Sequence, residues 1–592
     1  MNKKDILDKI KSLDGLSNEE RAYLINLVNT KKKYGLVWED KPEQVEEDLR
    51  TRLPVLKEVK ERAIINDTES EKHPNHIIIE GDNLHALTAL SFTHEGKIDV
   101  IYIDPPYNTG NKDFIYNDNY VDKDDSYRHS KWLSFMNRRL KVANKLLSDS
   151  GVIFISIDDN EQAQLKLLCD DIFGENKLVG IVTVAKGTTT GQDAKSFGSS
   201  CDYLLVYANN QFKLGKFEMS EKDVKRFSRS DEKGAYSILQ WRKTGNNDRR
   251  EDRPNLYYGV VSPNGQEVYP IGPTGYESRW RGSKKSFLEY EKDNMVEWVV
   301  SSGEWKPYLK YYLEGRGKAP SNLWIDIEGN KKATIELKEI FKNNLFNNPK
   351  PTDLIDKCLQ IAINKDSLIL DFFAGSGTTM HAVIKRNLTD SGSRKVILVT
   401  NNENNIAEEI TYERNKRVIR GYKNSKGQKV EGLKNNNLRY YQCDFVERTP
   451  TLNNKRELTQ LATELLCIKE DCYHPVSHHL SFSDKEAQIY TNGKGKYLVA
   501  IYYSRNQIAV QEQLIEWVQA VTDATEKIRL YGFSPEKETL AEEFAAVEDK
   551  IEAVALPEAI YNAYLATFKT IKVDKKDYAL TKASATETGP NN

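Results

Sequence analysis

Residues 97–107 read KIDVIYIDPPY, an apolar run that ends in an aspartate and two prolines. Its continuous Ile and Val residues are typical of a strand that is buried on both faces of a parallel sheet. The strand ends at Asp104, because the two prolines that follow fix the backbone and have no N–H for further pairing. The sequence therefore predicts a buried strand that closes in a rigid turn, Asp104-Pro105-Pro106-Tyr107.

Strands and helices alternate on both sides of this stretch. Before residue 180 we expect strands at HIIIEGD (76–82) and GVIFISID (151–158), and helices at WLSFMNRRLKVANKLL (132–147) and EQAQLKLLCDDIF (161–173). The pattern returns near Lys350 with TDLIDKCLQIAI (352–363), DSLILDFFAGSGTT (366–379), the helix MHAVIKRN (380–387) and the strand KVILVTNNE (395–403). Such alternation predicts an α/β fold that is split by an insertion.

We expect five regions along the chain. They are an N-terminal helical accessory segment (1–70), a first α/β half (71–180), an insertion (181–345), a second α/β half (346–445) and a C-terminal α+β domain (446–592). Capping-box spacing at Ser17-x-x-Glu20 indicates a helix that carries the apolar positions Tyr23, Leu24, Ile25 and Leu27. The polar end KASATETGPNN (582–592) is typical of a frayed tail.

The composition limits the class of protein. The chain is 39% hydrophobic and 29% charged, with a mean hydropathy of −0.65, which is typical of a globular protein. It has neither an apolar run of about 18 residues nor the pattern of a signal peptide, so we expect a cytoplasmic protein without a membrane span. The formal net charge is −2, so any nucleic-acid surface must be local. The six cysteines fit reduced core thiols better than a disulfide framework.

A glycine-rich turn follows the buried strand LILD. Gly375 and Gly377 lie in FAGSGTT, between this strand and a helix, where a ligand can approach backbone amides without interference from a Cβ atom. A nucleotide-like ligand is therefore expected at the carboxyl edge of the sheet. A phosphate-binding P-loop would need a lysine that GSGTT lacks, and Met380 stands where a dinucleotide fingerprint needs its third glycine. A turn that serves packing alone is the alternative.

The turn Asp104-Pro105-Pro106-Tyr107 offers a matching chemistry. An aromatic amine is a poor nucleophile, so an enzyme that alkylates it must accept its hydrogens. The Asp104 carboxylate and the Pro105 carbonyl could form that acceptor pair, and Tyr107 could stack on a base that has been flipped out of the duplex. The alternative is a simple turn that closes a strand.

The motifs GDNLHAL (81–87), IYIDPPYNTG (101–110) and ILDFFAGSGTT (369–379), in this order, resemble the β-class amino-methyltransferases. More narrowly, YNDNY, SKWLSFMNRRL, FISIDDNE, RPNLYY and PSNLWIDI are similar to the modification (Mod) subunits of type III restriction-modification systems. The resemblance covers roughly residues 75 to 445. It implies a Rossmann-like methyltransferase sheet in permuted order, with the catalytic half before the cofactor half and a target-recognition domain inserted between them.

The resemblance also implies site residues and a cofactor, S-adenosyl-L-methionine. Catalysis would fall to Asp104, Pro105, Pro106 and Tyr107, by direct attack of the amine on the methyl group. The residues expected at the cofactor are Asp371, Phe373, Ala374, Gly375, Ser376, Gly377, Thr378, Thr379, Glu403, Asp82 and Lys350. An aspartate in the first position favours adenine N6 as the target, because the N4-cytosine relatives more often carry serine there.

The insertion carries interleaved basic and aromatic residues, as expected where phosphates and base edges are both contacted. The candidates for DNA binding are Arg242, Lys243, Arg249, Arg250, Arg253, Arg279, Trp280, Arg281, Lys284 and Lys285. A solvated face of mixed charge is the alternative, because acidic residues such as Asp248 and Glu251 interrupt the clusters.

No metal site is expected. Cys467, Cys472, His474, His478 and His479 lack the spacing of ordinary zinc ligands. His129 could be drawn as a general base, but direct attack by the amine does not need one.

The resemblance implies three partners: double-stranded DNA, a second copy of the chain, and a separate helicase-nuclease restriction (Res) subunit. Two other functions stay open at this point. The same pocket could methylate RNA or another amine, or the chain could recognise DNA without catalysis.

Overall fold

The computed structural model describes residues 36–573, apart from 69, 112, 118, 187–197, 302, 328, 344, 363, 477–479, 503–504 and 535–536, and, before residue 36, residues 9–13, 15–17, 20–21 and 24–25. The chain forms two compact units. Unit 1 comprises Met1–Leu214 with Ser321–Asn592, and unit 2 comprises Gly215–Pro320. Each unit is described by itself.

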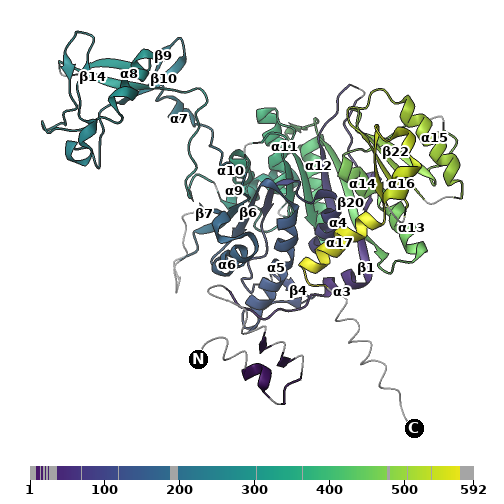
Figure 1. Ribbon diagram of the computed structural model, residues 1–592. Helices are drawn as coiled ribbons and strands as arrows, with labels where there is room; N and C mark the ends of the chain where they lie inside the picture. Colours follow the sequence, from purple (N-terminus) through teal and green to yellow (C-terminus); the bar gives the residue numbers. More distant parts are fainter. Residues whose placement is uncertain are drawn as a thin grey trace. The chain divides into compact units, whose positions relative to one another are not determined.

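Unit 1 is built on a ten-stranded sheet with the order β1-β20-β2-β17-β16-β3-β6-β8-β7-β15 (Figure 1). The strands in chain order are β1 (Arg52–Glu58), β2 (Asn75–Glu80), β3 (Ile98–Ile103), β6 (Leu147–Ile157), β7 (Leu178–Ala185), β8 (Cys201–Ala208), β15 (Leu323–Trp324), β16 (Leu368–Asp371), β17 (Lys395–Thr400) and β20 (Asn437–Glu447). The buried strands expected around residues 76–82, 97–103, 151–158, 366–371 and 395–400 are confirmed.

The strand order confirms the permuted α/β fold. Strands β17 and β16, which follow the insertion, lie between β2 and β3, which precede it. The strands from β2 to β6 pair in parallel, so their carboxyl ends share one edge. The next strand, β8, pairs antiparallel with β6 and with β7, and so begins at this same edge.

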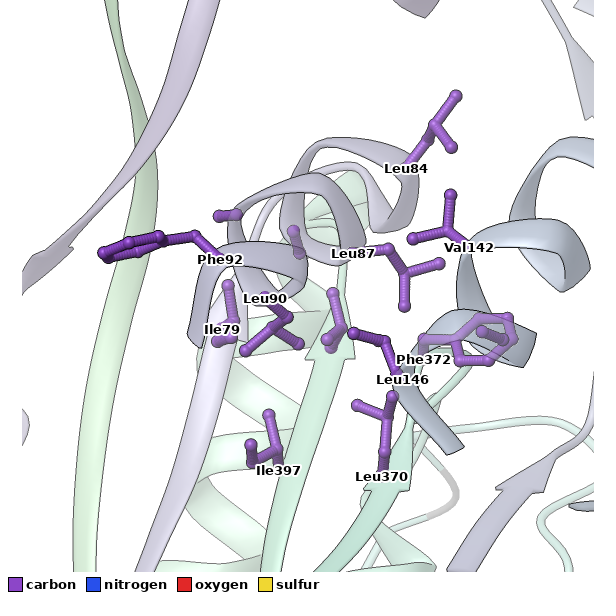
Figure 2. Packing of buried hydrophobic residues seen from close by; sticks show 14 of the residues in the cluster. Ile79, Leu84, Leu87, Leu90, Phe92, Val142, Leu146, Leu370, Phe372 and Ile397 are labelled. Atoms are coloured by element: carbon purple, nitrogen blue, oxygen red, sulfur yellow. The ribbon is translucent and has the colours of Figure 1, made fainter. Parts of the chain in front are cut away.

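Helices cover both faces of this sheet. On one face α4 (Asn83–His94) packs against α5 (Arg128–Leu146), α17 (Glu558–Thr570) and α14 (Thr463–Glu470), and α5 packs against α6 (Gln162–Phe173). Figure 2 shows Ile79, Ile397 and Leu370 of the sheet directed toward this helical layer. Every residue of α4 from Leu84 to His94 is buried, so its apolar residues are not confined to one stripe.

The other face of the sheet carries a second helical layer. Helix α10 (Thr352–Ala362) packs against α11 (Thr378–Asp390) and β3, and α11 packs against β17 and α12 (Glu413–Arg420). Residues that alternate with those of the first face, such as Val100 and Leu398, are also buried. Burial on both faces explains the uninterrupted apolar runs in the sequence.

The insertion is shorter than the expected 181–345. Strands β7 and β8 extend the large sheet, with Ile153 of β6 opposite Tyr207 of β8, and α9 (Asn330–Phe341) also belongs to unit 1. These strands pair antiparallel to each other, so the parallel strand-helix alternation stops before the sheet does. The compact inserted body is unit 2, Gly215–Pro320.

Unit 2 contains a four-stranded antiparallel sheet, β13-β14-β10-β9, and a separate hairpin. Its elements are α7 (Glu221–Val224), β9 (Arg229–Asp231), β10 (Gly234–Gln240), β11 (Val260–Val261), β12 (Glu267–Val268), α8 (Lys284–Lys292), β13 (Val296–Ser301) and β14 (Glu304–Tyr312). A small core of Trp241, Val260, Trp280, Phe287 and Leu309 holds the sheet, the hairpin and α8 together.

The C-terminal part of unit 1 forms a second sheet, β21-β22-β23-β24-β25, in which the last three strands are parallel. Its elements are α13 (Leu452–Leu461), β21 (His474–Pro475), β22 (Ala487–Thr491), β23 (Tyr497–Ile501), α15 (Gln507–Ala520), β24 (Ile528–Gly532), α16 (Lys537–Glu543) and β25 (Ile551–Ala555), together with α14 and α17. No helix among the described residues is long and apolar enough to cross a membrane.

The expected N-terminal capping box is confirmed. The Ser17 N–H donates to Glu20 Oε2 at 2.8 Å, and the Glu20 N–H donates to Ser17 Oγ at 3.2 Å. The positions Tyr23 and Leu27 and the tail 582–592 lie outside the described residues.

Candidate active site

The loops after four neighbouring strands meet at the carboxyl edge of the large sheet. In the parallel register Leu370 of β16 lies opposite Ile101 of β3, and Thr400 of β17 lies opposite Glu80 of β2. The loops that follow these strands are therefore neighbours, and they line one cavity of about 980 Å³. This edge is where open parallel sheets bind their ligands.

The turn after β3 carries the expected acceptors. The Tyr107 hydroxyl donates a hydrogen bond to Asp104 Oδ1 at 3.0 Å. The Pro106 carbonyl accepts from Trp132 Nε1 at 2.7 Å, so it is already used within the protein. No hydrogen bond from the described part of the chain reaches the Pro105 carbonyl, and Pro105 lines the cavity. Asp104 and Pro105 are thus the acceptors that a ligand amine could use.

The residue after this turn fixes its position. Asn108 is fully buried and has a φ of +56°, a left-handed conformation that asparagine tolerates better than most residues. Its side-chain amide donates to Glu161 Oε1 at 2.6 Å, and His129 Nδ1 lies 2.6 Å from the same oxygen. His129 therefore stabilises the loop through Glu161, and it does not line the cavity.

Two lysines and two aspartates form an alternating chain of ion pairs beside the turn after β3. Lys350 Nζ lies 3.3 Å from Asp104 Oδ1 and 3.2 Å from Asp202 Oδ2, and Lys186 Nζ lies 2.6 Å from Asp202 Oδ1. The Tyr107 hydroxyl is hydrogen-bonded to Lys350 Nζ and lies 3.4 Å from Asp202 Oδ2. Two cations thus balance two carboxylates, as buried charges require.

Burial and these neighbouring charges shift the pKa values of Asp104, Lys350 and Tyr107. Burial raises the pKa of Asp104, the Lys350 ammonium opposes this rise, and the neighbouring charge of Asp202 adds to it. Burial alone would lower the pKa of Lys350, but the two carboxylates outweigh it and raise that pKa. Burial and the adjacent carboxylates raise the pKa of Tyr107 well above its ordinary value. Lys350 and Tyr107 therefore stay protonated and act as donors to Asp104.

The glycine-rich turn after β16 depends on two backbone conformations. Gly375 has a φ of +48°, and a Cβ there would lie 3.2 Å from Phe346 Cζ in the cavity wall. Gly377 has a φ of +72° and is the N-cap residue of α11, and a Cβ there would lie 2.5 Å from Asn415 Nδ2. Both positions exclude a side chain, so the glycines are needed for the shape of the turn.

Two buried charged side chains, Asp371 and Arg414, form hydrogen bonds with the glycine-rich turn. Asp371 accepts hydrogen bonds from the Phe373 N–H at 3.0 Å and from Thr379 Oγ1 at 2.6 Å. Burial raises the pKa of Asp371 to about 7. The buried Arg414 guanidinium donates to Thr378 Oγ1 at 2.7 Å and to Ser376 Oγ at 3.1 Å. Hydrogen bonds to buried side chains therefore hold the turn in this conformation.

A buried arginine joins the loop after β2 to the N-terminal segment. Arg139 donates to both carboxylate oxygens of Glu43, at 3.0 and 2.9 Å, and lies 3.4 Å from Asp82 Oδ2. It also bonds to Asn83 Oδ1, while Asn83 Nδ2 donates to the Phe372 carbonyl at 3.0 Å. Arg139 thus links the loops after β2 and β16, and it fixes Asp82 on the cavity wall.

The cavity gathers most of the predicted site. The predicted residues that line it are Asp82, Asp104, Pro105, Pro106, Tyr107, Lys350, Phe373, Gly375 and Glu403. The others lie in or under the glycine turn, outside the lining: Asp371, Ala374, Ser376, Gly377, Thr378 and Thr379. Glu403 begins the short helix η5 (Glu403–Asn405) and is exposed.

Sequence reasoning missed several residues of the site. Asp202 and Lys186 come from the ends of β8 and β7, which were assigned to the insertion, and Phe346 comes from the segment before α10. The apolar run in CDYLLVYA could have indicated another strand of the sheet, with Asp202 at its beginning. Nothing in the sequence points to Phe346.

In unit 2 the ten DNA-binding candidates separate into two groups. Trp280 is 1% exposed and belongs to the core, so it cannot contact DNA in this fold, and its assignment is corrected. The Arg242 and Arg279 side chains are also buried: Arg242 lies 3.5 Å from Asp248, and Arg279 donates to the Asn247 carbonyl at 2.6 Å. Basic side chains in these places hold loops together.

The remaining candidates are more accessible. Arg281 is half-buried and donates to the Gln240 carbonyl at 2.8 Å, and Arg250 is exposed and forms an ion pair of 2.7 Å with Glu277. Lys243 is half-buried. The exposed candidates that form no ion pair with a carboxylate in the described part of the chain are Arg249, Arg253, Lys284 and Lys285. Their role in DNA binding stays a prediction.

The cysteine-histidine cluster contains no described metal site. Cys467 and Cys472 are buried, His474 lies 2.9 Å from Asp67 Oδ2, and His478 and His479 fall outside the described residues. Among the residues described, no group of three or more His, Cys, Asp or Glu side chains could hold a metal ion.

Comparisons with known proteins agree with this geometry. The family model described as DNA methylase matches residues 98–424. The chain is 34% identical over 419 residues to the type III restriction-modification enzyme EcoPI Mod subunit of Escherichia phage P1, covering 63% of this chain and 64% of that protein. It is 38% identical over 361 residues to the type II methyltransferase M.KpnI of Klebsiella pneumoniae, covering 57% of this chain and 84% of that one.

Two further likenesses are to a second Mod subunit and to a solved structure. The StyLTI Mod subunit of Salmonella typhimurium is 34% identical, over 57% of this chain and 54% of its own length. The chain thus spans less than two thirds of the two Mod subunits. The solved PvuII DNA methyltransferase (cytosine-N4-specific) is 10% identical, covers 58% of this chain and 89% of its own, and has a TM-score of 0.31.

The permuted sheet and the two turns at its carboxyl edge agree with the family model, which matches more than half of the chain. The chain belongs to the DNA methylase family.

The residues of the cavity fit the methyl donor of such enzymes, S-adenosyl-L-methionine. A side chain at Gly375 would fill the narrow space beside Phe346, so this space is kept open by the bare backbone. Phe373 offers an apolar wall, and the carboxylates of Asp82 and Glu403 offer acceptors for amino and hydroxyl groups.

Proposed function

We propose that this chain is a site-specific DNA adenine-N6 methyltransferase that uses S-adenosyl-L-methionine. One observation carries the proposal: the acceptor pair of Asp104 and Pro105 lies in the same cavity as the glycine turn at Gly375. A carboxylate and an unused carbonyl next to each other can accept both hydrogens of an exocyclic amine. The aspartate in the first position favours adenine over cytosine.

The chain's own residues account for activation of the amine. When bound, the donor supplies a methyl group attached to a positively charged sulfur. The Asp104 carboxylate accepts one hydrogen of the amine and the Pro105 carbonyl accepts the other, so the nitrogen lone pair is directed away from both. The Tyr107 ring provides a face for the flipped base, while its hydroxyl holds Asp104 Oδ1. No covalent link between protein and base is required.

The cofactor residues that line the cavity would each contact a different part of the methyl donor. Phe373 and Gly375 would lie along its methionine part, and Glu403 would accept hydrogen bonds from the ribose hydroxyls. Asp82, held by Arg139, would accept from the adenine amine. Asp371, Ser376, Gly377, Thr378 and Thr379 would act indirectly by keeping the turn in place.

We further propose that the chain is the recognition and modification subunit of a type III restriction-modification system. The likeness to the EcoPI and StyLTI Mod subunits supports this proposal. Unit 2 would recognise the site on double-stranded DNA, and the chain would form a homodimer that associates with a helicase-nuclease subunit. Exposed basic side chains at Arg249, Arg253, Lys284 and Lys285 support a DNA-binding role for unit 2.

The test is transfer of a labelled methyl group to duplex DNA, followed by digestion to nucleosides. We expect N6-methyladenine, and we expect Asp104→Ala to abolish transfer while DNA binding and cofactor binding persist. N4-methylcytosine would correct the target base, and label in RNA or protein alone would overturn the DNA assignment. Methylation-sensitive sequencing of DNA from cells that express the chain would report base, strand and site together.

A further inference from the structure

A second carboxylate lies beside Asp104 and has no part in the mechanism above. Asp202 lies at the start of strand β8, and because β8 runs antiparallel to β6 it enters the sheet at the edge where the catalytic turns leave it. Asp202 lines the cavity and is 7% exposed. A buried carboxylate is costly unless it is paired, so its partners indicate what it does.

Asp202 shares both of its inner partners with Asp104. Lys350 Nζ lies 3.2 Å from Asp202 and 3.3 Å from Asp104, and the Tyr107 hydroxyl lies 3.4 Å and 3.0 Å from the same two carboxylates. Lys186 Nζ holds the outer oxygen of Asp202 at 2.6 Å. The Lys350 ammonium is thus shared between the two carboxylates at nearly equal distances.

The contacts of Asp104 leave one oxygen for the substrate. Tyr107 and Lys350 both contact Oδ1, and no hydrogen bond or ion pair of Oδ2 is found with the described residues. A lysine paired with Asp104 alone would withdraw more of its negative charge and weaken it as an acceptor. The position of Lys350 therefore controls the basicity of Asp104.

We propose that Asp202 is a positioning residue for Asp104. It draws the Lys350 ammonium toward itself, and thereby keeps Asp104 basic enough to take a proton from the target amine. This inference rests on the proposed function, because it assigns Asp104 the amine.

The chemistry needs such an acceptor. The nitrogen forms a bond to the methyl carbon as the carbon–sulfur bond breaks, and sulfur keeps the electron pair of that bond. The nitrogen then carries a positive charge and must lose one proton. The Asp104 carboxylate receives that proton at Oδ2, becomes a neutral acid, and later releases it to water. Asp202 takes no proton in this step and acts through Lys350.

The charged groups around Asp202 predict opposite effects for two variants. Lys350 and Lys186 are its cations, and Asp104, Asp158 and Tyr107 are its titratable neighbours. In Asp202→Asn, the Lys350 ammonium pairs with Asp104 alone and favours its ionised form. The acid limb of the pH–rate profile, which reports protonation of Asp104, should therefore move to lower pH. In Lys186→Met a cation is lost near Asp104, so the same limb should move to higher pH.

The experiment measures single-turnover methyl transfer against pH, with cofactor and DNA binding measured alongside. For Asp202→Asn we expect a plateau rate about 10-fold below the wild type, a shifted acid limb and binding constants within about 2-fold. Asp202→Glu should restore the limb. A matched control is Asp170→Asn, because Asp170, like Asp202, has both lysine and tyrosine partners, here Lys166 at 2.6 Å and Tyr207 at 2.8 Å, and lies away from the cavity.

A second readout does not depend on methyl transfer. Amine-selective labelling of Lys350, followed by mass spectrometry across pH, reports its protonation directly. Asp202→Asn should make Lys350 react at lower pH, because one of its two carboxylates is lost. Unchanged Lys350 labelling overturns the proposal, as does a loss of stability and cofactor binding without a shift of the acid limb. If Asp202→Asn does not fold, the opposite shift in Lys186→Met decides.

The two proposals fail in different ways. If the wild type transfers no methyl group to DNA, the proposed function fails, while the labelling of Lys350 still tests the coupling between the carboxylates. If transfer is found and both variants follow the wild-type pH profile, only the role of Asp202 fails.

Discussion

The side-chain amide of Asn108 donates a hydrogen bond of 2.6 Å to Glu161, a fully buried carboxylate at the start of α6. This bond ties the end of the Asp104–Tyr107 turn to helix α6, none of whose residues lines the cavity. The turn is therefore positioned from outside the site, and its geometry depends on this attachment.

Asn108→Ala should lower the rate of methyl transfer by about 10-fold or more, with cofactor binding retained. The variant loses the bond to Glu161 and places alanine at a φ of +56°, which costs on the order of 1 kcal/mol in strain alone. Single-turnover rates and cofactor titration check this. Asn294→Ala is the matched control, because Asn294 has the same φ of +56° but is exposed in unit 2. Equal rates for Asn108→Ala and the wild type would falsify the role of the attachment.

Gly377→Ala should abolish cofactor binding and lower the free energy of unfolding by about 2 to 3 kcal/mol. Its φ is +72°, and the added Cβ would lie 2.5 Å from Asn415 Nδ2 and 3.1 Å from the Thr411 carbonyl, so strain and a clash add together. Gly427→Ala separates the two effects, because Gly427 has a φ of +77° with open space around it, and should cost about 1 kcal/mol. Denaturant unfolding and cofactor titration measure both. Equal losses in the two variants would mean that strain alone is responsible.

Stability should fall as the pH rises through the range set by Asp371. Burial raises its pKa from an ordinary value of 3.8 to about 7, so the folded protein holds a proton that the unfolded chain releases between these values. The resulting contribution to stability is complete below about pH 4 and is lost by about pH 7, and its full size is on the order of 2 to 4 kcal/mol. Unfolding of Asp371→Asn should lack this component. The same pH dependence in both proteins would exclude Asp371 as its source.

Exposed and buried basic residues of unit 2 should differ in their effect on DNA binding. Replacing Arg249, Arg253, Lys284 or Lys285 with glutamine should weaken binding about equally on all sequences and reduce the slope of affinity against salt by about one for each phosphate that is no longer neutralised. Arg279→Gln should instead destabilise unit 2, because the Arg279 side chain is buried among backbone carbonyls. Salt-dependent titrations and thermal unfolding distinguish the two outcomes. An unchanged salt slope in all four variants would place the DNA elsewhere.

Local patterns predicted the centre of the fold well. The strand that ends at Asp104 and the turn at Gly375 are specified by their own residues, because apolar runs, prolines and glycines act over a few positions. Asp202 could not be assigned in this way, since its place depends on β8 entering the sheet antiparallel. Trp280 was assigned to an interface because composition does not distinguish a buried aromatic ring from an exposed one, and packing against Val260 and Phe287 decides the matter.

The strand order also has a consequence for synthesis of the chain. Strands β2 and β3 leave the ribosome early, but the strands that separate them, β17 and β16, are complete only at Thr400. A nascent chain shorter than this has two apolar strands with unpaired edges and no partners to fill the gap between them. We expect chaperones to bind such a chain, and truncated products should be degraded rather than accumulate.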